Sequence, residues 1–317
     1  MERLMKTKLK MALIIGILFS LTACSNDELL NTNFDFDTAE EAILALIADT
    51  DSLEQYDGLN DGEAVNISSS TDGSLSKSAG DTIQPVRLGR RIDSKSFDRS
   101  VEIFGDSIAI VTSIGTISGD FIIIYQLTDS SSFDTLAKPF DMEMIRKIKL
   151  RRIGDGEIRR LNWRIIGITP VVGGTINSTL EFQRFEMISQ SGDSLIITDP
   201  LNTYYSWTDL PEFEPGDSVS VFLSLTNSSD FDDELVLLHH GARSRLDKGR
   251  KQLHDDGIGV DEVADDNIYS NTFLSRSTRG RMRHGFVDAL DWGTVFVTDE
   301  PVNMKVWGMP YHIRHRN

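Results

Sequence analysis

The densest group of side chains that can do chemistry is a run of acids and amides between residues 255 and 267. Carboxylate and amide oxygens are the ligands that Ca²⁺ prefers, and the ion takes roughly six to eight of them. The spacing of an EF-hand loop is absent. Two interpretations therefore stay open: a calcium site, or a set of turns in which the carboxylates accept hydrogen bonds from nearby backbone amides. The candidate ligands are Asp255, Asp256, Asp261, Asp265, Asp266 and Asn267.

A second group of candidates consists of basic residues on two predicted strands, 147–151 and 161–165, in which charged and apolar side chains alternate. This alternation predicts a cationic sheet face. Such a face can form a basic groove for an acidic glycan or a lipid headgroup. The alternative is a solvated strand face that the acidic N-terminal stretch partly neutralises. The candidate binding residues are Arg146, Lys147, Lys149, Arg151 and Arg164.

Catalytic motifs are weak in this chain. Residues 192–195 spell the Gly-Asp-Ser-Leu tetrapeptide of GDSL esterases, but Ser194 leads into a strand-like run and no histidine lies three residues after an aspartate. Without a general base a serine hydroxyl is a poor nucleophile, so we interpret this tetrapeptide as a hairpin turn. His239 and His240 are adjacent on a predicted strand and should point to opposite faces. We identify no catalytic residues.

The composition limits the classes of partner. The 317 residues carry 32 Lys plus Arg, 49 Asp plus Glu and a single cysteine, with a formal net charge of −17. One cysteine excludes an intrachain disulfide and a cysteine-based zinc cluster. Strong acidity argues against binding to a nucleic-acid backbone, which requires Lys and Arg. We expect no nucleic-acid partner, and no cofactor other than the candidate Ca²⁺.

The single cysteine lies directly after a segment with the pattern of an export signal. Four basic residues within positions 3–10 precede an apolar run over residues 11–19, which is too short for an ordinary transmembrane helix. The run ends at Leu21-Thr22-Ala23-Cys24, which resembles the lipobox of bacterial lipoproteins. That resemblance implies a signal peptide over 1–23 and a lipid-modified Cys24 that attaches the protein to the membrane. An ordinary secretory signal followed by an incidental cysteine is the alternative.

The residues after Cys24 indicate which membrane of the cell would hold the protein. Ser25 stands where enterobacterial lipoproteins retained in the inner membrane carry Asp, so the resemblance implies an outer-membrane lipoprotein of the bacterial cell envelope. Residues 25–28 also resemble the acidic export tag of Bacteroidetes surface lipoproteins. Both a periplasmic and a surface-facing orientation remain open.

Residues 24–84 are predicted to form an acidic helix and a flexible tether. This stretch holds fourteen acidic residues and Lys77 as its one base. Thr38-Ala39-Glu40-Glu41 is a capping-box pattern that opens a helix, and Ile43 and Ile47 fall on one of its faces. We expect this face to dock on the following domain. Residues 57–81 are rich in Gly, Ser, Asp and Asn, a composition that cannot bury enough apolar surface to fold.

The rest of the chain is predicted to be mainly β, in two β-rich domains. Residues 85–208 form the first, of uncertain type, and include a hairpin around Gly105-Asp106. A boundary rich in proline near residue 209 precedes the second, over 209–317. Its strand 218–225 alternates, with Val219, Val221, Leu223 and Leu225 on one side.

The C-terminal domain carries the second resemblance. The run from Leu253 to Ser270, with its Asp-Asp-Gly and Tyr-Ser steps, resembles a loop of immunoglobulin-like domains in exported bacterial choice-of-anchor proteins. The resemblance implies an immunoglobulin-like β-sandwich. Asn267 stands where that loop has glycine, and asparagine tolerates the left-handed backbone, so we expect the turn to form.

The sequence therefore predicts a lipid-anchored envelope protein that acts as a non-enzymatic binding or scaffold module for a protein or a glycan. An envelope hydrolase with its site in the middle domain is the alternative. Fold alone does not choose between them.

Overall fold

The computed structural model describes residues 36–50, 65–66, 83–127, 131–206, 208–231, 233–242, 249–275 and 281–313. Cys24 and the predicted signal peptide lie outside these ranges, as do residues 51–64 and 67–82 of the segment 24–84 predicted as helix and tether. The described chain is mainly β, as predicted, and its sheets are mostly antiparallel. The shortest elements of the described chain are β1 (Val65–Asn66), β9 (Glu212–Phe213) and the 3₁₀ helix η3 (Arg159–Asn162).

The predicted capping box forms at the start of helix α2 (Ala39–Ala48). The Thr38 hydroxyl accepts a hydrogen bond from the Glu41 amide, and the Glu41 carboxylate accepts one from the Thr38 amide. Ile43 and Ile47 are buried in a cluster with side chains of three strands. The helix therefore docks on the β-structure, as its sequence indicates. No helix of the described ranges is long and apolar enough to cross a membrane.

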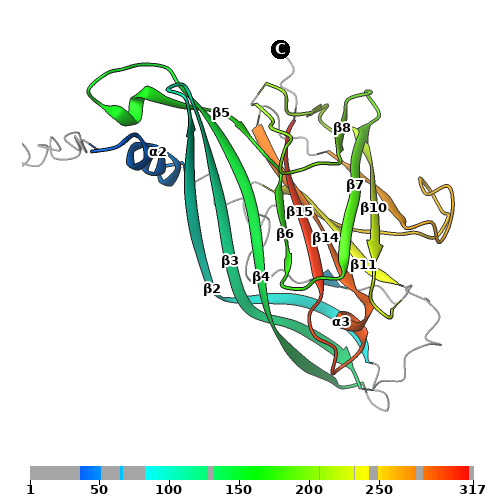
Figure 1. The fold of residues 1–317 in the computed structure, drawn as a ribbon. Coiled ribbons are helices and arrows are strands. Elements are labelled where there is room, and N and C mark those ends of the chain that lie inside the picture. Colours follow the sequence, from blue (N-terminus) through cyan, green and yellow to red (C-terminus); the bar gives the residue numbers. More distant parts are fainter. Residues whose placement is uncertain are drawn as a thin grey trace, which may run out of the picture.

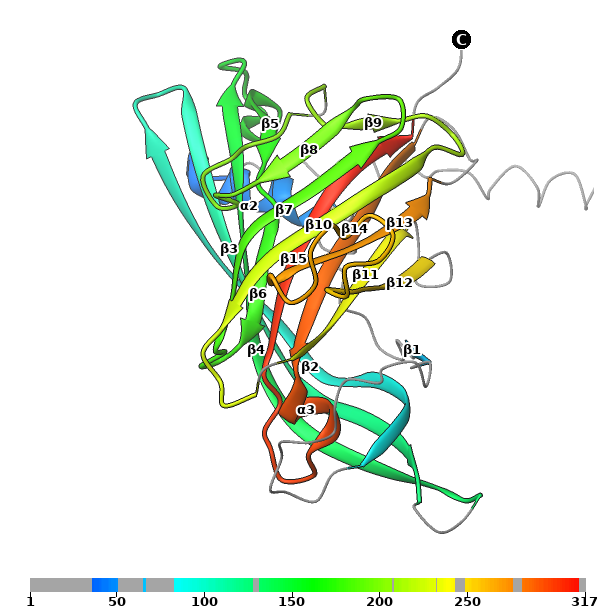
Figure 2. The same ribbon diagram turned by 90° about the vertical axis from the view of Figure 1, so that its right-hand side faces the viewer.

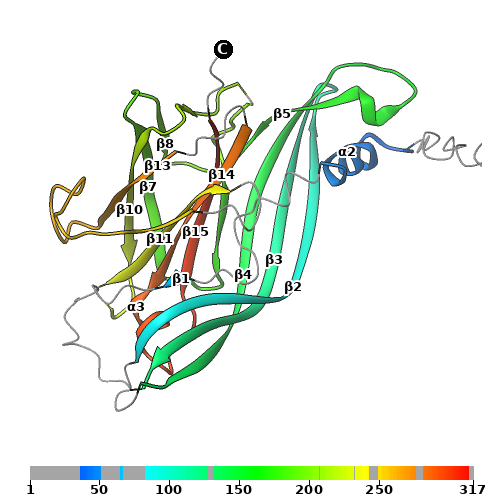
Figure 3. The ribbon, with the colours of Figure 1, turned by 180° about the vertical axis from the view of Figure 1, so that it is seen from behind.

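Three long strands make up one side of the molecule: β2 (Gln84–Phe104), β3 (Ile108–Gln126) and β4 (Phe133–Arg152). They pair in order and curve strongly (Figure 1). A register shift in β2 between Ile92 and Ser94 lies beside Gly119, where a Cβ atom would collide with the carbonyl oxygen of Arg91. A bulge opposite a glycine bends a strand, and Figure 3 shows β2 curving toward helix α3 (Trp292–Phe296).

The strands form two sheets. The larger has eleven strands in the order β1-β2-β3-β4-β6-β15-β14-β11-β12, with β5 on β4 and β9 on β15. The smaller has the order β13-β10-β7-β8 and lies across the larger one in Figure 2. The remaining strands are β5 (Trp163–Ile168), β6 (Val171–Thr175), β7 (Leu180–Ser189), β8 (Ser194–Ile197), β10 (Ser218–Asn227), β11 (Glu234–Ala242), β12 (Gly249–Leu253), β13 (Ile268–Leu274), β14 (Arg281–Asp291) and β15 (Met304–Ile313).

The main core lies between the two sheets. Val219, Val221, Leu223 and Leu225 of β10 are all buried there, which confirms the alternation predicted for this strand. A second core cluster lies on the opposite face of the larger sheet, where β2, β3 and β4 curve over it and α3 closes one end. Lys138 of β4 reaches α3 and donates hydrogen bonds to the carbonyl oxygens of Thr294 and Glu300.

Neither sheet belongs to only one of the two domains predicted to meet near residue 209. β10 pairs with β7 and β15 pairs with β6, so strands from both predicted domains share both sheets. Local alternation defines each strand but carries no information about its distant partner, and this explains the difference from the predicted division. The described chain thus forms two packed sheets built jointly by residues 85–208 and 209–313.

Candidate functional site

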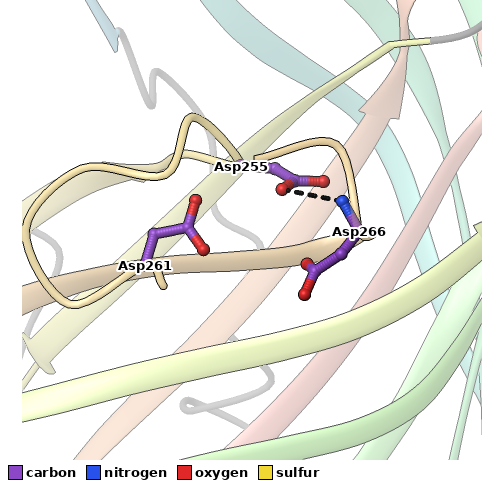
Figure 4. A group of neighbouring side chains, drawn as sticks. All are labelled: Asp255, Asp261 and Asp266. Carbon is purple, nitrogen blue, oxygen red and sulfur yellow. Dashed lines mark hydrogen bonds between the residues drawn. The ribbon is translucent and has the colours of Figure 1, made fainter. Parts of the chain in front are cut away.

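The acidic run forms a compact loop after β12. Asp255, Asp261 and Asp266 each offer a carboxylate oxygen, and the three atoms lie within 4.8 Å of one another (Figure 4). Burial raises the pKa of Asp255 above its usual value, and hydrogen bonds from the amides of Asn267 and Asp266 only partly offset this increase. These three oxygens are close enough to bind one cation, but they are only three of the roughly six to eight ligands that Ca²⁺ takes.

The same carboxylates also bind the loop's own backbone. Asp255 accepts from the amides of Asp266 at 3.2 Å and Asn267 at 2.7 Å, and Asp261 accepts from Gly257 at 2.6 Å. Asp256 and Asp266 accept from the amides two residues ahead, at 2.9 Å each. These contacts explain the acid density without an ion.

Three of the predicted ligands lie outside the cluster of carboxylates. Asp256 is exposed and takes part in a turn, while Asp265 and Asn267 have φ of 59° and 65°. Both are in the left-handed region, as expected for Asn267. Asp265 and Asn267 therefore serve the loop through their backbone conformation.

Four of the five predicted basic residues share one face of the sheet, and the fifth, Arg146, does not. Lys147, Lys149 and Arg151 occupy alternate positions of β4 and share a face. Arg164 of β5 is the direct register partner of Arg151. Arg146 points the other way and is only 7% exposed, because alternate residues of β4 such as Met144 and Ile148 face the core. We define the basic face as Lys147, Lys149, Arg151 and Arg164.

The side chains of the basic face are open to solvent to different degrees. Arg151 and Arg164 are exposed, and Lys147 and Lys149 are half-buried. The Lys149 ammonium lies 5.5 Å from the centre of the Tyr204 ring. No ion pair within the described ranges joins the four residues to a carboxylate. Nearby Arg152 and Arg160, in contrast, pair with Asp155 and Asp49.

A pocket of about 800 Å³ opens at the end of the long strands nearest α2. Asn162 closes the loop beside it by exchanging hydrogen bonds with both backbone groups of Gly156, at 2.8 Å each. Arg159, which also lines the pocket, donates a hydrogen bond to the carbonyl oxygen of Asp37, just before α2. The lining mixes both charges with apolar side chains, including Asp106, Arg152, Asp155, Glu157, Ile103 and Trp163.

The serine and the two adjacent histidines considered as catalytic candidates lie in a turn and in packed cores. Ser194 begins strand β8 after a turn at Gly192, as predicted. His239 stacks on Phe286 at 4.0 Å between ring centres, and His240 contacts Phe273 at 4.3 Å. Because Phe286 and Phe273 belong to the two different core clusters, the adjacent histidines face opposite sides of β11.

One buried polar group was not predicted from the sequence. One carboxylate oxygen of Asp288 accepts a hydrogen bond from Arg90, and the other lies 3.1 Å from His239 Nε2. Burial would raise the pKa of Asp288, but the charges and hydrogen bonds of Arg90 and His239 outweigh it and hold the pKa below its ordinary range. All three residues are buried, which indicates a structural role. An acid within the apolar run 285–290 is the signal that could have revealed it.

Comparison with known proteins adds no family to this description: no family model, curated protein or solved structure matches the chain.

Proposed function

We propose that this chain is a lipid-anchored protein of the bacterial cell envelope and acts as a non-enzymatic binding module for an anionic glycan. In this proposal residues 1–23 are removed as a signal peptide and Cys24 carries the lipid in the outer membrane. The lipobox-like Leu21–Cys24 supports the anchor. The basic face supports the class of ligand.

The observation that carries the ligand proposal is the register of β4 and β5. It brings Arg164 opposite Arg151 and aligns both with Lys147 and Lys149 on one solvent-facing surface. Four like charges close together repel one another, and an anionic ligand that bridges them relieves this repulsion. The overall charge of −17 makes a cationic surface of this kind stand out from the rest of the molecule.

The sheet that carries this face also suits a scaffold. We propose an immunoglobulin-like relationship for the part in which the smaller sheet packs on β11, β14 and β15. The acidic loop between β12 and β13, which motivates that relationship, lies at the edge of this part. A rigid sheet with many fixed side chains orients a polymer better than a flexible loop does.

The test is a binding titration with polygalacturonate, an acidic polysaccharide. We expect the double variant Arg151→Gln/Arg164→Gln to weaken binding by about three- to tenfold, because each exposed charge contributes only a modest free energy. Added salt should weaken binding of the unmodified protein as well. Arg184→Gln is the matched control, since Arg184 is an exposed arginine of β7 that pairs with Glu186 at 2.7 Å. Equal affinities of the double variant and the unmodified protein would contradict the proposal.

A further inference from the structure

Large apolar side chains are exposed at one end of the long strands. We define the tip as the turn around residues 103–107 and the loop 153–162 that follows β4. The described ranges contain fourteen exposed large apolar residues, and five of them belong to the tip. They are Ile103 (43% exposed), Phe104 (50%), Ile153 (57%), Ile158 (46%) and Leu161 (62%). Apolar groups that gather in this way mark a contact surface.

The tip is held in place by backbone hydrogen bonds. The Arg152 amide donates to the carbonyl oxygen of Ser107 at 2.8 Å, which joins the loop to the turn between β2 and β3. The Ile153 amide donates to the carbonyl oxygen of Asn162 at 2.7 Å, and this bond closes the loop on itself. These bonds fix the backbone of the turn and of the loop that carry the five apolar residues, with Ile103 and Phe104 on opposite faces at the end of β2.

The described chain also begins at the tip. Asp37, two residues into the described part, accepts a hydrogen bond from Arg159, and Ala39 lines the same pocket as Ile103. Figures 1 and 3 show α2 beside this end of the long strands, and α3 at the other end. Cys24 precedes Phe36 by twelve residues. Because an extended residue spans at most about 3.5 Å, a lipid on Cys24 keeps Phe36 within about 40 Å of the bilayer.

The charges around the tip suit the headgroup layer. Arg152 and Arg159 line the pocket, and Arg151 and Arg164 of the basic face are next in sequence to the lining residues Arg152 and Trp163. Long arginine side chains keep their charge in the polar layer while their stems lie against apolar groups. Asp106, Asp155 and Glu157 also lie in the pocket, so deep burial in hydrocarbon is excluded and contact at the boundary between headgroups and acyl chains is favoured.

We propose that the tip docks on the membrane that holds the lipid anchor, with Ile103, Phe104, Ile153, Ile158 and Leu161 inserted at the interface. This proposal rests on the lipid anchor at Cys24 of the proposed function. Docking fixes the orientation of the folded body: the long strands rise from the membrane, and the basic face extends from the headgroup layer outward along β4.

The single native cysteine allows a direct test on the full chain. The variants Leu161→Cys and Gln183→Cys each receive a maleimide-linked fluorophore, and the acylated protein is reconstituted into vesicles of phosphatidylethanolamine and phosphatidylglycerol. A lipid-modified Cys24 does not react with maleimide. Gln183 is the control position because it is exposed on β7, outside the tip. Quenchers attached to acyl chains and aqueous iodide then report the surroundings of each fluorophore.

We expect the fluorophore at position 161 to be quenched from the lipid phase and shielded from iodide, and the one at position 183 to behave in the opposite way. Adding Ile103→Ser and Ile153→Ser to the Leu161→Cys variant should lower the equilibrium constant for docking by about tenfold or more, since two large apolar side chains are removed from the interface. Quenching of position 161 by iodide alone would overturn docking. Maleimide labelling of Cys24 in the otherwise unmodified protein would instead overturn the anchor, and with it the docking that rests on the anchor.

Discussion

At the scale of single residues, the strongest energetic statement concerns Asp288. Its carboxylate is the shared partner of Arg90 and His239 in a fully enclosed environment. Removing one member of a buried ion pair leaves the other charge uncompensated, which costs about 3–5 kcal/mol. We therefore predict that Asp288→Asn lowers the free energy of unfolding by about this amount, measured by urea denaturation. Asp265→Asn is the control, because asparagine also tolerates the left-handed backbone at that exposed position.

The lowered pKa of Asp288 gives the same prediction a pH dependence. A carboxyl whose pKa is lower in the folded state stabilises the protein above its unfolded pKa of about 4 and loses this contribution as the pH falls below that value. The unmodified protein should lose stability on acidification through this range, and Asp288→Asn should lose less. Parallel stability curves for the two proteins would contradict the assigned role.

The acidic loop yields a test that separates its two interpretations. Since Asp255 accepts hydrogen bonds from two backbone amides, Asp255→Ala should lower the midpoint of thermal unfolding whether or not calcium is added. If the carboxylates act only as turn formers, millimolar Ca²⁺ and a chelator leave the midpoint of the unmodified protein unchanged. If Ca²⁺ instead raises the unfolding midpoint of the unmodified protein, and Asp255→Ala abolishes this increase, the carboxylates bind the ion.

At the scale of elements, the curvature of the long strands depends on a close backbone approach. Gly119 lies against Arg91 at the bulge in β2, and a Cβ atom there would collide with the carbonyl oxygen of that residue. We predict that Gly119→Ala destabilises the protein by about 1–3 kcal/mol, since overpacking forces the backbone to move. Thr116→Ala, at an exposed position of the same strand, should change the unfolding midpoint by much less. Equal effects of the two substitutions would show that the bulge does not need the glycine.

The elements that the sequence predicts well are those defined by neighbouring residues. The capping box at Thr38 and the alternation from Val219 to Leu225 both involve interactions within one element, and both are confirmed. The hairpin around Gly105 and Asp106 is also present, since β2 ends at Phe104 and β3 begins at Ile108. Gly105 has φ of 56°, so its conformational freedom is used in the turn.

The elements that the sequence does not reveal depend on partners far along the chain. The middle of β2, over residues 93–100, is polar and mostly exposed, so no apolar alternation marks it as part of one 21-residue strand. Pairing with β3 holds it in the sheet. The position of Arg146 was misjudged for a different reason: Arg146 and Lys147 are adjacent in a strand and point to opposite faces, so only Lys147 shares the face of Lys149.

At the scale of the whole molecule, the shared sheets predict cooperative unfolding. Separating residues 209–317 from the rest would break the pairing of β10 with β7 and of β15 with β6. Strands that pair within the same sheets are expected to unfold together. We predict one calorimetric transition for the full chain, with equal calorimetric and van't Hoff enthalpies. Two resolved transitions would favour the predicted division into independent domains.

The proposed function also makes a prediction that places the ligand on the molecule. Lysine acetylation followed by mass spectrometry, with and without saturating polygalacturonate, compares the basic face with the rest of the surface. Bound glycan should slow acetylation of Lys147 and Lys149 and leave that of Lys251, an exposed lysine of β12, unchanged. Protection of Lys251 without protection of Lys147 and Lys149 would contradict the assignment of the basic face as the binding site.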